Sequence, residues 1–129
     1  MIKSGILNPA ICSLLARVRH TNCFVIADRG FPFWPEVEIL DISLVDNVPT
    51  VLEVLKAVVP NFHIGRAWMA QEFKEFNPIE VQQPFAAVIS PVRIEYEPHC
   101  EFKKRVPKAI GLIRTGDTIQ YANVILESA

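Results

Sequence analysis

The sequence predicts an α/β fold in three layers, with helices on both faces of a central, mainly parallel sheet. Short apolar segments rich in Val, Ile and Phe alternate along the chain with segments of helical spacing. This alternation is typical of parallel sheets whose two faces are both covered. The chain has 129 residues, half of them hydrophobic, which is enough for one core. We therefore expect a single domain over residues 1–129.

The first predicted elements are a helix and a buried strand. Asn8 caps a helix and Pro9 fits its first position, and apolar residues at helical spacing continue it to near Arg19. Cys23–Ala27 is apolar throughout and too short for a helix, so we expect a central strand. Glycine and proline interrupt residues 30–35, and a second strand is expected over Val37–Ile42.

The middle of the chain begins with a strong helix signal. Thr50 and Glu53 form a capping box, and the helix that they begin should end near Val59, before a proline. A strand is expected over Ile64–Ala70, followed by a short helix over Gln71–Phe76.

The last third repeats the same alternation. The expected elements are a helix started by Asn77 and Pro78, strands at Val92–Tyr96, Ala109–Arg114 and Tyr121–Leu126, and a helix at His99–Arg105. Only a short link, with a turn at Thr115–Asp117, joins the last two strands. A parallel crossover needs a longer connection, so we expect these two strands to pair antiparallel.

Charge and cysteine content exclude several classes of protein. The net charge is −1, from 13 basic and 14 acidic residues, so nucleic acid is not an expected partner. No long apolar run opens the chain, which predicts neither a signal peptide nor a membrane span. Three cysteines without paired spacing indicate reduced thiols and a cytoplasmic protein. The high apolar content favours self-association.

Two titratable residues flank the first predicted strand. His20 precedes Cys23–Ala27 and Asp28 follows it. Polar groups at the carboxyl end of a buried strand are where open α/β sheets build sites. We expect the loop before the strand to bring His20 back over the sheet. A carboxylate beside an imidazole would fix its tautomer and keep it basic, as acid–base catalysis requires.

Further candidates lie toward the end of the chain. His99 and Lys103 are four residues apart and would share one helix face. Tyr121 and Asn123, two apart on a predicted strand, would point the same way and could hold hydroxyl groups. The aromatic loop of residues 31–35 favours a subunit contact, with stacking on a ligand ring as the alternative.

Neither a metal nor an organic cofactor is expected. His20, Asp28, His63 and His99 could converge, but the chain contains no HExxH motif and no paired-cysteine spacing. It also lacks GxGxxG and the P-loop pattern, so neither a dinucleotide nor a nucleoside triphosphate is indicated.

Motifs spread along the chain carry a family resemblance. In order they are KSGILNPAICSLLARVRHTN, VIADRGFP, ILDISL, HCEFKK, AIGLIRTGD and YANVIL. Together they resemble the D-ribose pyranase and L-fucose mutarotase family (RbsD/FucU) over nearly the whole chain, with the ribose branch closer. Arg29 departs from the family pattern, which has a small residue there, and the loop of residues 31–35 is bulkier.

The resemblance implies a cytoplasmic isomerase that interconverts cyclic forms of a free monosaccharide without a cofactor. It further implies a ring-shaped homo-oligomer, typically a decamer, with sites at subunit contacts. Carried over by motif, the catalytic residues would be His20, Asp28 and His99. The substrate-binding residues would be Lys103, Tyr121 and Asn123.

The expected chemistry is ring opening and closure of D-ribose by paired acid and base. His20, oriented by Asp28, would be one partner, and His99 or a water that it holds would be the other, in either role. The alternatives are an L-fucose-type mutarotase, a non-catalytic sugar-binding or regulatory oligomer, and a purely structural oligomer.

Overall fold

A single mixed sheet forms the centre of the molecule. The computed structural model describes all 129 residues, and its six strands are arranged in the order β2-β5-β1-β6-β3-β4. The strands are β1 (Cys23–Ala27), β2 (Glu38–Asp41), β3 (Ile64–Ala70), β4 (Ile94–Glu97), β5 (Gly111–Arg114) and β6 (Val124–Ser128). All neighbouring strands are parallel except β6, which runs antiparallel to both β1 and β3.

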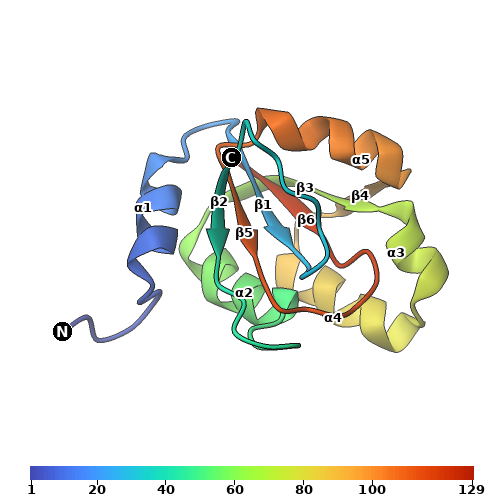
Figure 1. Ribbon diagram of the computed structural model, residues 1–129, viewed down its shortest axis with the longest axis horizontal. Coiled ribbons are helices and arrows are strands. Elements are labelled where there is room, and N and C mark those ends of the chain that lie inside the picture. Colours follow the sequence, from blue (N-terminus) through green and yellow to red (C-terminus); the bar gives the residue numbers. More distant parts are fainter.

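Helices cover both faces of this sheet, as predicted (Figure 1). They are α1 (Pro9–Arg17), α2 (Val51–Val58), α3 (Gln71–Phe76), α4 (Ile79–Ile89) and α5 (His99–Arg105), with 3₁₀ turns at Val59–Asn61 and Val106–Lys108. Successive residues of β1 point to opposite faces. Phe24 and Ile26 pack with α1, α2 and α4, whereas Val25 and Ala27 pack with Phe102 of α5. The three-layer α/β/α prediction is therefore confirmed.

Most of the predicted helices and strands are present in the structure, and their bounds agree best where the local sequence signals are strong. The observed bounds of β1, β3, α3 and α5 equal the predicted ones. The capping box is confirmed, because Thr50 and Glu53 exchange hydrogen bonds between side chain and backbone. Asn77, however, does not cap α4. Its amide donates instead to the carbonyl oxygens of Phe73 and Gln120, at 2.8 and 2.9 Å, and Pro78 stands at the cap position.

The predicted pairing of the last two strands is wrong. β1 lies between β5 and β6, and β6 begins at Val124 rather than at Tyr121. The reason is that Thr115 ties the end of β5 to β1. Its backbone N–H and its hydroxyl both donate to the carbonyl oxygen of Ala27, at 2.9 and 2.8 Å. The chain then crosses the end of β1 as a loop, and that loop contains Tyr121 and Asn123.

Gly116 allows this loop to pack closely on the preceding turn. A methyl group at Gly116 would overlap the carbonyl oxygen of Val45 and lie 3.0 Å from that of Val48. Both atoms belong to the backbone, so relief requires the loop to move. We expect Gly116→Ala to destabilise the fold by about 1–3 kcal/mol, measured by urea denaturation. An unchanged unfolding midpoint would contradict this packing.

Candidate active site

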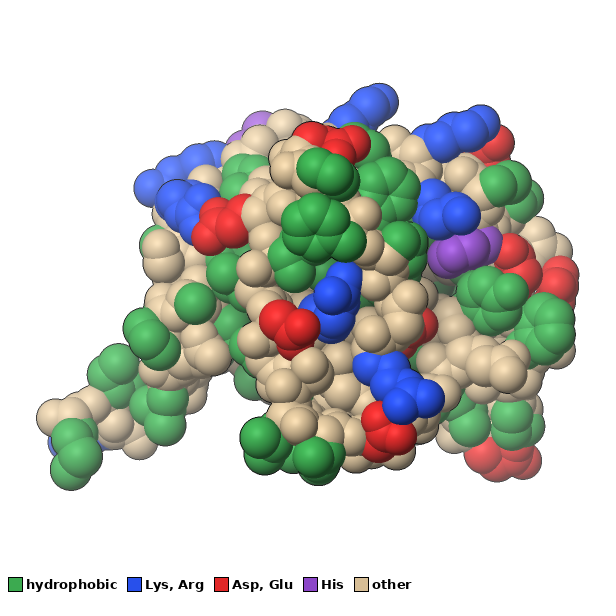
Figure 2. All heavy atoms as spheres, in the orientation of Figure 1, with side chains coloured by type: hydrophobic (Ala, Val, Ile, Leu, Met, Phe, Trp, Pro, Cys, Tyr) green, Lys and Arg blue, Asp and Glu red, His purple; other side chains and the backbone are tan.

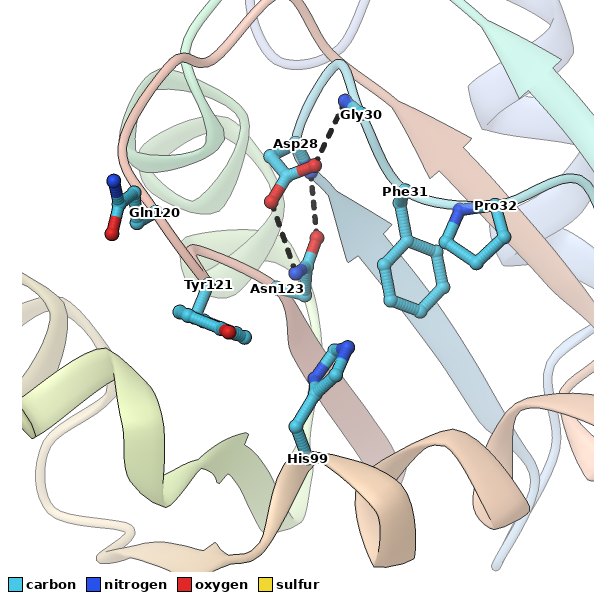
Figure 3. A pocket seen from close by; sticks show the side chains of 8 residues that line it. All are labelled: Asp28, Gly30, Phe31, Pro32, His99, Gln120, Tyr121 and Asn123. Carbon is cyan, nitrogen blue, oxygen red and sulfur yellow. Dashed lines mark hydrogen bonds between the residues drawn. The ribbon is translucent and has the colours of Figure 1, made fainter. Parts of the chain in front are cut away.

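A cleft of about 420 Å³ opens at the carboxyl end of β1, within the range of ~300–1,000 Å³ that holds small ligands. Its walls come from the loop after β1, the start of α5 and the loop before β6 (Figure 3). The lining residues are Asp28, Gly30, Phe31, Pro32, His99, Gln120, Tyr121 and Asn123. Six of these eight are not hydrophobic, so the cleft can accept a ligand with many hydroxyl groups.

Three hydrogen bonds join Asp28 to Asn123 and Gly30. Its carboxylate accepts from the amide of Asn123 at 3.1 Å and from the backbone N–H of Gly30 at 2.9 Å. Its own N–H donates to the amide oxygen of Asn123 at 2.8 Å. Asn123 is only 2% exposed, and both ends of its amide face Asp28. Asn123 thus orients the carboxylate, and it also lines the cleft.

Burial sets the protonation behaviour of Asp28. Removal from water raises the pKa of this carboxyl above its ordinary value. The hydrogen bonds from Asn123 and Gly30 oppose that rise, because they stabilise the charged form, and nearby Asp117 adds to it. The result is a carboxylate that is a stronger proton acceptor than an exposed aspartate.

His99 faces Asp28 from the opposite wall (Figure 3). It is the first residue of α5, so the helix start determines where the imidazole lies. Burial lowers the pKa of His99, the charge of Lys103 lowers it further, and Glu72 and Asp28 oppose these effects. The imidazole is therefore mostly neutral at neutral pH and can accept a proton. The pKa values of Asp28 and His99 are thus shifted toward each other.

Aromatic rings complete the cleft around the imidazole. Tyr121 lies edge-on to His99, with ring centroids 5.1 Å apart, and it packs on Phe76 at 5.6 Å. Its backbone has a φ of 58°, in the left-handed region, so Tyr121 lies in a turn. The buried Phe31 contacts His99 from another side, at 6.3 Å.

The structure brings four of the six predicted site residues to one cleft: Asp28, His99, Tyr121 and Asn123. The prediction that Tyr121 and Asn123 share one face of a strand is wrong, because both precede β6. Lys103 does not line the cleft, but it lies one turn after His99 on α5 and acts on that residue through its charge.

The expected pairing of His20 with Asp28 does not occur within one chain. His20 is exposed, and the neighbouring Thr21 donates its N–H to the carbonyl oxygen of Ser128, at the far end of the sheet. A strand of five residues, about 17 Å long, separates His20 from Asp28. The loop before β1 does not fold back over the sheet, because it pairs with the end of β6.

Four lining residues were not predicted: Gly30, Phe31, Pro32 and Gln120. Each is within four residues of a predicted site residue. Phe31 and Pro32 also belong to the aromatic loop of residues 31–35, for which contact with a ligand ring was the alternative prediction. Arg29, which departs from the family pattern, does not line this cleft. Its guanidinium pairs with Asp46 at 2.5 Å, on the surface.

Two further observations concern metals and membranes. Nowhere do three or more His, Cys, Asp or Glu side chains come together in an arrangement that could hold a metal ion. None of the helices has the length and apolar character needed to cross a bilayer.

Comparisons with known proteins find relatives that match the whole chain. The model of the RbsD / FucU transport protein family matches residues 1–129. A D-ribose pyranase of Geobacillus kaustophilus is 41% identical over 128 residues, which are 99% of this chain and 93% of that protein. A D-ribose pyranase of Laribacter hongkongensis is 38% identical over 99% of this chain and 97% of that protein.

Solved structures extend the likeness to three dimensions. Bacillus subtilis RbsD, complexed with D-ribose, has a TM-score of 0.93 and 34% identity, with 100% of this chain and 98% of that chain covered. The fucose mutarotase of Streptococcus pneumoniae, in complex with L-fucose, shares the fold, with a TM-score of 0.83, 19% identity and 99% and 98% covered. With matches along its whole length in both sequence and fold, the chain belongs to the RbsD / FucU family.

Proposed function

We propose that this protein is a D-ribose pyranase, an isomerase that interconverts the pyranose and furanose forms of the free sugar without a cofactor. The observation that carries this proposal is a polar cleft in which Asp28 and His99 face each other from opposite walls. The ribose-branch relatives support D-ribose as the substrate, because they are 34–41% identical over nearly the whole chain.

The reaction needs two proton transfers in each direction. Ring opening removes the proton of the anomeric hydroxyl while the ring oxygen receives a proton. Closure on a different hydroxyl then reverses these steps. Asp28 and His99 are suited to this exchange because burial raises the pKa of the first and lowers that of the second. Positioned acid–base groups typically accelerate a reaction by ~10²–10⁴-fold. This acceleration suffices for a reaction that also proceeds unaided in water.

We assign the remaining site residues to binding and completion of the cleft. Tyr121 and Gln120 would contact the hydroxyl groups of the sugar, and Lys103 would tune His99. His20 of the partner subunit would enter the cleft beside Asp28, because His20 is exposed and cannot reach Asp28 of its own chain.

Exposed apolar side chains support this self-association. Large hydrophobic residues lie on the surface in the N-terminal arm, in the loop after β2 and beside the cleft: Met1, Ile2, Leu7, Phe33, Leu44, Val45, Val48, Phe76 and Ile79. Figure 2 shows hydrophobic side chains along the N-terminal arm, which projects from the body. We propose a ring-shaped homo-oligomer, a decamer, in the cytoplasm, with neither nucleic acid nor membrane as a partner.

Saturation-transfer NMR on free sugars tests this function directly. We expect the protein to accelerate exchange between the pyranose and furanose signals of D-ribose, and to act much more weakly on the anomers of L-fucose. Faster exchange for L-fucose than for D-ribose would move the assignment to the fucose branch. Calorimetric binding of ribose without any accelerated exchange would indicate a non-catalytic sugar-binding protein.

A further inference from the structure

A carboxylate outside the cleft holds the first residue of α5. Both oxygens of Glu72, on α3, accept a hydrogen bond from the backbone N–H of His99, at 3.0 and 2.9 Å. Pro98 occupies the cap position of α5 and provides no side-chain hydrogen bond. Glu72 is therefore the side chain that caps this helix, and it does so from a different element.

This contact acts on the residue that carries the imidazole. The first N–H groups of a helix lack partners within the helix, and a carboxylate there is stabilised by the positive end of the helix. α5 is only seven residues long, so its start has little support from its own helical hydrogen bonds. Loss of Glu72 would leave the N–H of His99 without its partner and would free the start of α5 to move.

We propose, on the basis of the role proposed above for His99, that Glu72 is a positioning residue of the active site. It fixes the location of the His99 imidazole through the backbone of that residue, and its negative charge acts on the ring. Glu72 does not line the cleft itself, so we expect it to act through His99 rather than by contact with the sugar.

The charge of Glu72 is one of three that act on the imidazole. Lys103 acts from the same helix, Asp28 from the end of β1, and Glu72 from α3. Lys103 and burial lower the pKa of His99, whereas Glu72 and Asp28 raise it. Removal of the charge on Glu72 should therefore lower this pKa further. Neutral His99 would then persist to lower pH, and the acid limb of the pH–rate profile would move to lower pH with it.

Two variants separate the hydrogen bond from the charge. Glu72→Ala removes both, and Glu72→Gln keeps a carbonyl oxygen as acceptor but removes the charge. Glu75→Gln, at an exposed position on the same helix, is the matched control. The full-length protein is used for two measurements: NMR titration of the His99 imidazole without sugar, and ribose exchange as a function of sugar concentration and pH.

We expect Glu72→Ala to lower the maximal exchange rate by about 10–100-fold, because small displacements of a catalytic group are that costly. The sugar concentration at half-maximal rate should change less. Glu72→Gln should retain most of the wild-type rate. It should also lower the pKa of His99 and shift the acid limb of the pH–rate profile to lower pH. Glu75→Gln should behave as the wild type in both measurements.

Two results would overturn the assignment. One is a folded Glu72→Ala protein that exchanges ribose at the wild-type rate, and the other is a Glu72→Gln protein in which His99 titrates as in the wild type. If Glu72→Ala does not fold, the titration of Glu72→Gln decides by itself. Because that titration needs no sugar, a wild type inactive on ribose would refute the proposed function without removing the test of Glu72.

Discussion

Replacement of Asp28 by asparagine is expected to reduce catalysed ribose exchange by about 10²–10⁴-fold. The variant removes the carboxylate that faces His99 and with it one of the two proton-transfer groups. The new amide would also point a donor at the amide of Asn123, which now donates to Asp28 at 3.1 Å. We therefore expect a loss of stability of about 1–3 kcal/mol as well. Saturation-transfer NMR measures the first effect and urea denaturation the second.

A double variant distinguishes lost chemistry from lost structure. Asp28→Asn combined with Asn123→Asp restores a donor facing an acceptor, but it moves the carboxylate to position 123. Stability should recover in part while exchange stays slow. Asp46→Asn, the same chemical change in an exposed pair with Arg29, should leave exchange as it is. Recovery of activity in the double variant would show that catalysed exchange requires the hydrogen-bonded pair and does not require the carboxylate at position 28.

The second large effect is expected at a residue far from the cleft of its own chain. His20→Ala should lower ribose exchange by about 10²–10⁴-fold, although His20 is exposed and lies at the other end of β1. The physical reason is that His20 of the partner subunit would act together with Asp28 as one of the two proton-transfer groups, with His99 as the other. His63→Ala, another exposed histidine, is the control and should retain activity.

Mixed oligomers test where His20 acts. His20→Ala and Asp28→Asn chains can be expressed in one cell and purified together through two different tags. At some subunit contacts of these mixed oligomers, an intact His20 of one chain meets an intact Asp28 of its neighbour. With random assembly, about a quarter of the sites regain both groups, so activity should return to a corresponding fraction of the wild-type level. If oligomers that contain both chains remain as inactive as the single variants, His20 does not act in the cleft of a neighbouring subunit.

Local sequence signals determined the elements and much of the cleft. A five-residue apolar run followed by Asp28 predicted both a buried strand and a polar group at its carboxyl end, because strand ends in α/β sheets meet at one edge. The helix expected over His99–Arg105, which presents His99, occurs with the predicted bounds. These features depend only on neighbouring residues, so the sequence alone sufficed to predict them.

The position of β6 and the separation of His20 from Asp28 depend on contacts between segments that are distant in the sequence. Thr115 bonds to Ala27, so β1 lies between β5 and β6, and Tyr121 and Asn123 lie in a loop. That loop turns Asn123 onto Asp28. The sequence thus determined which residues are available for the proposed chemistry, whereas tertiary structure decided which of them meet. Hydrogen bonds between residues nearly a hundred positions apart leave no periodic pattern in the chain.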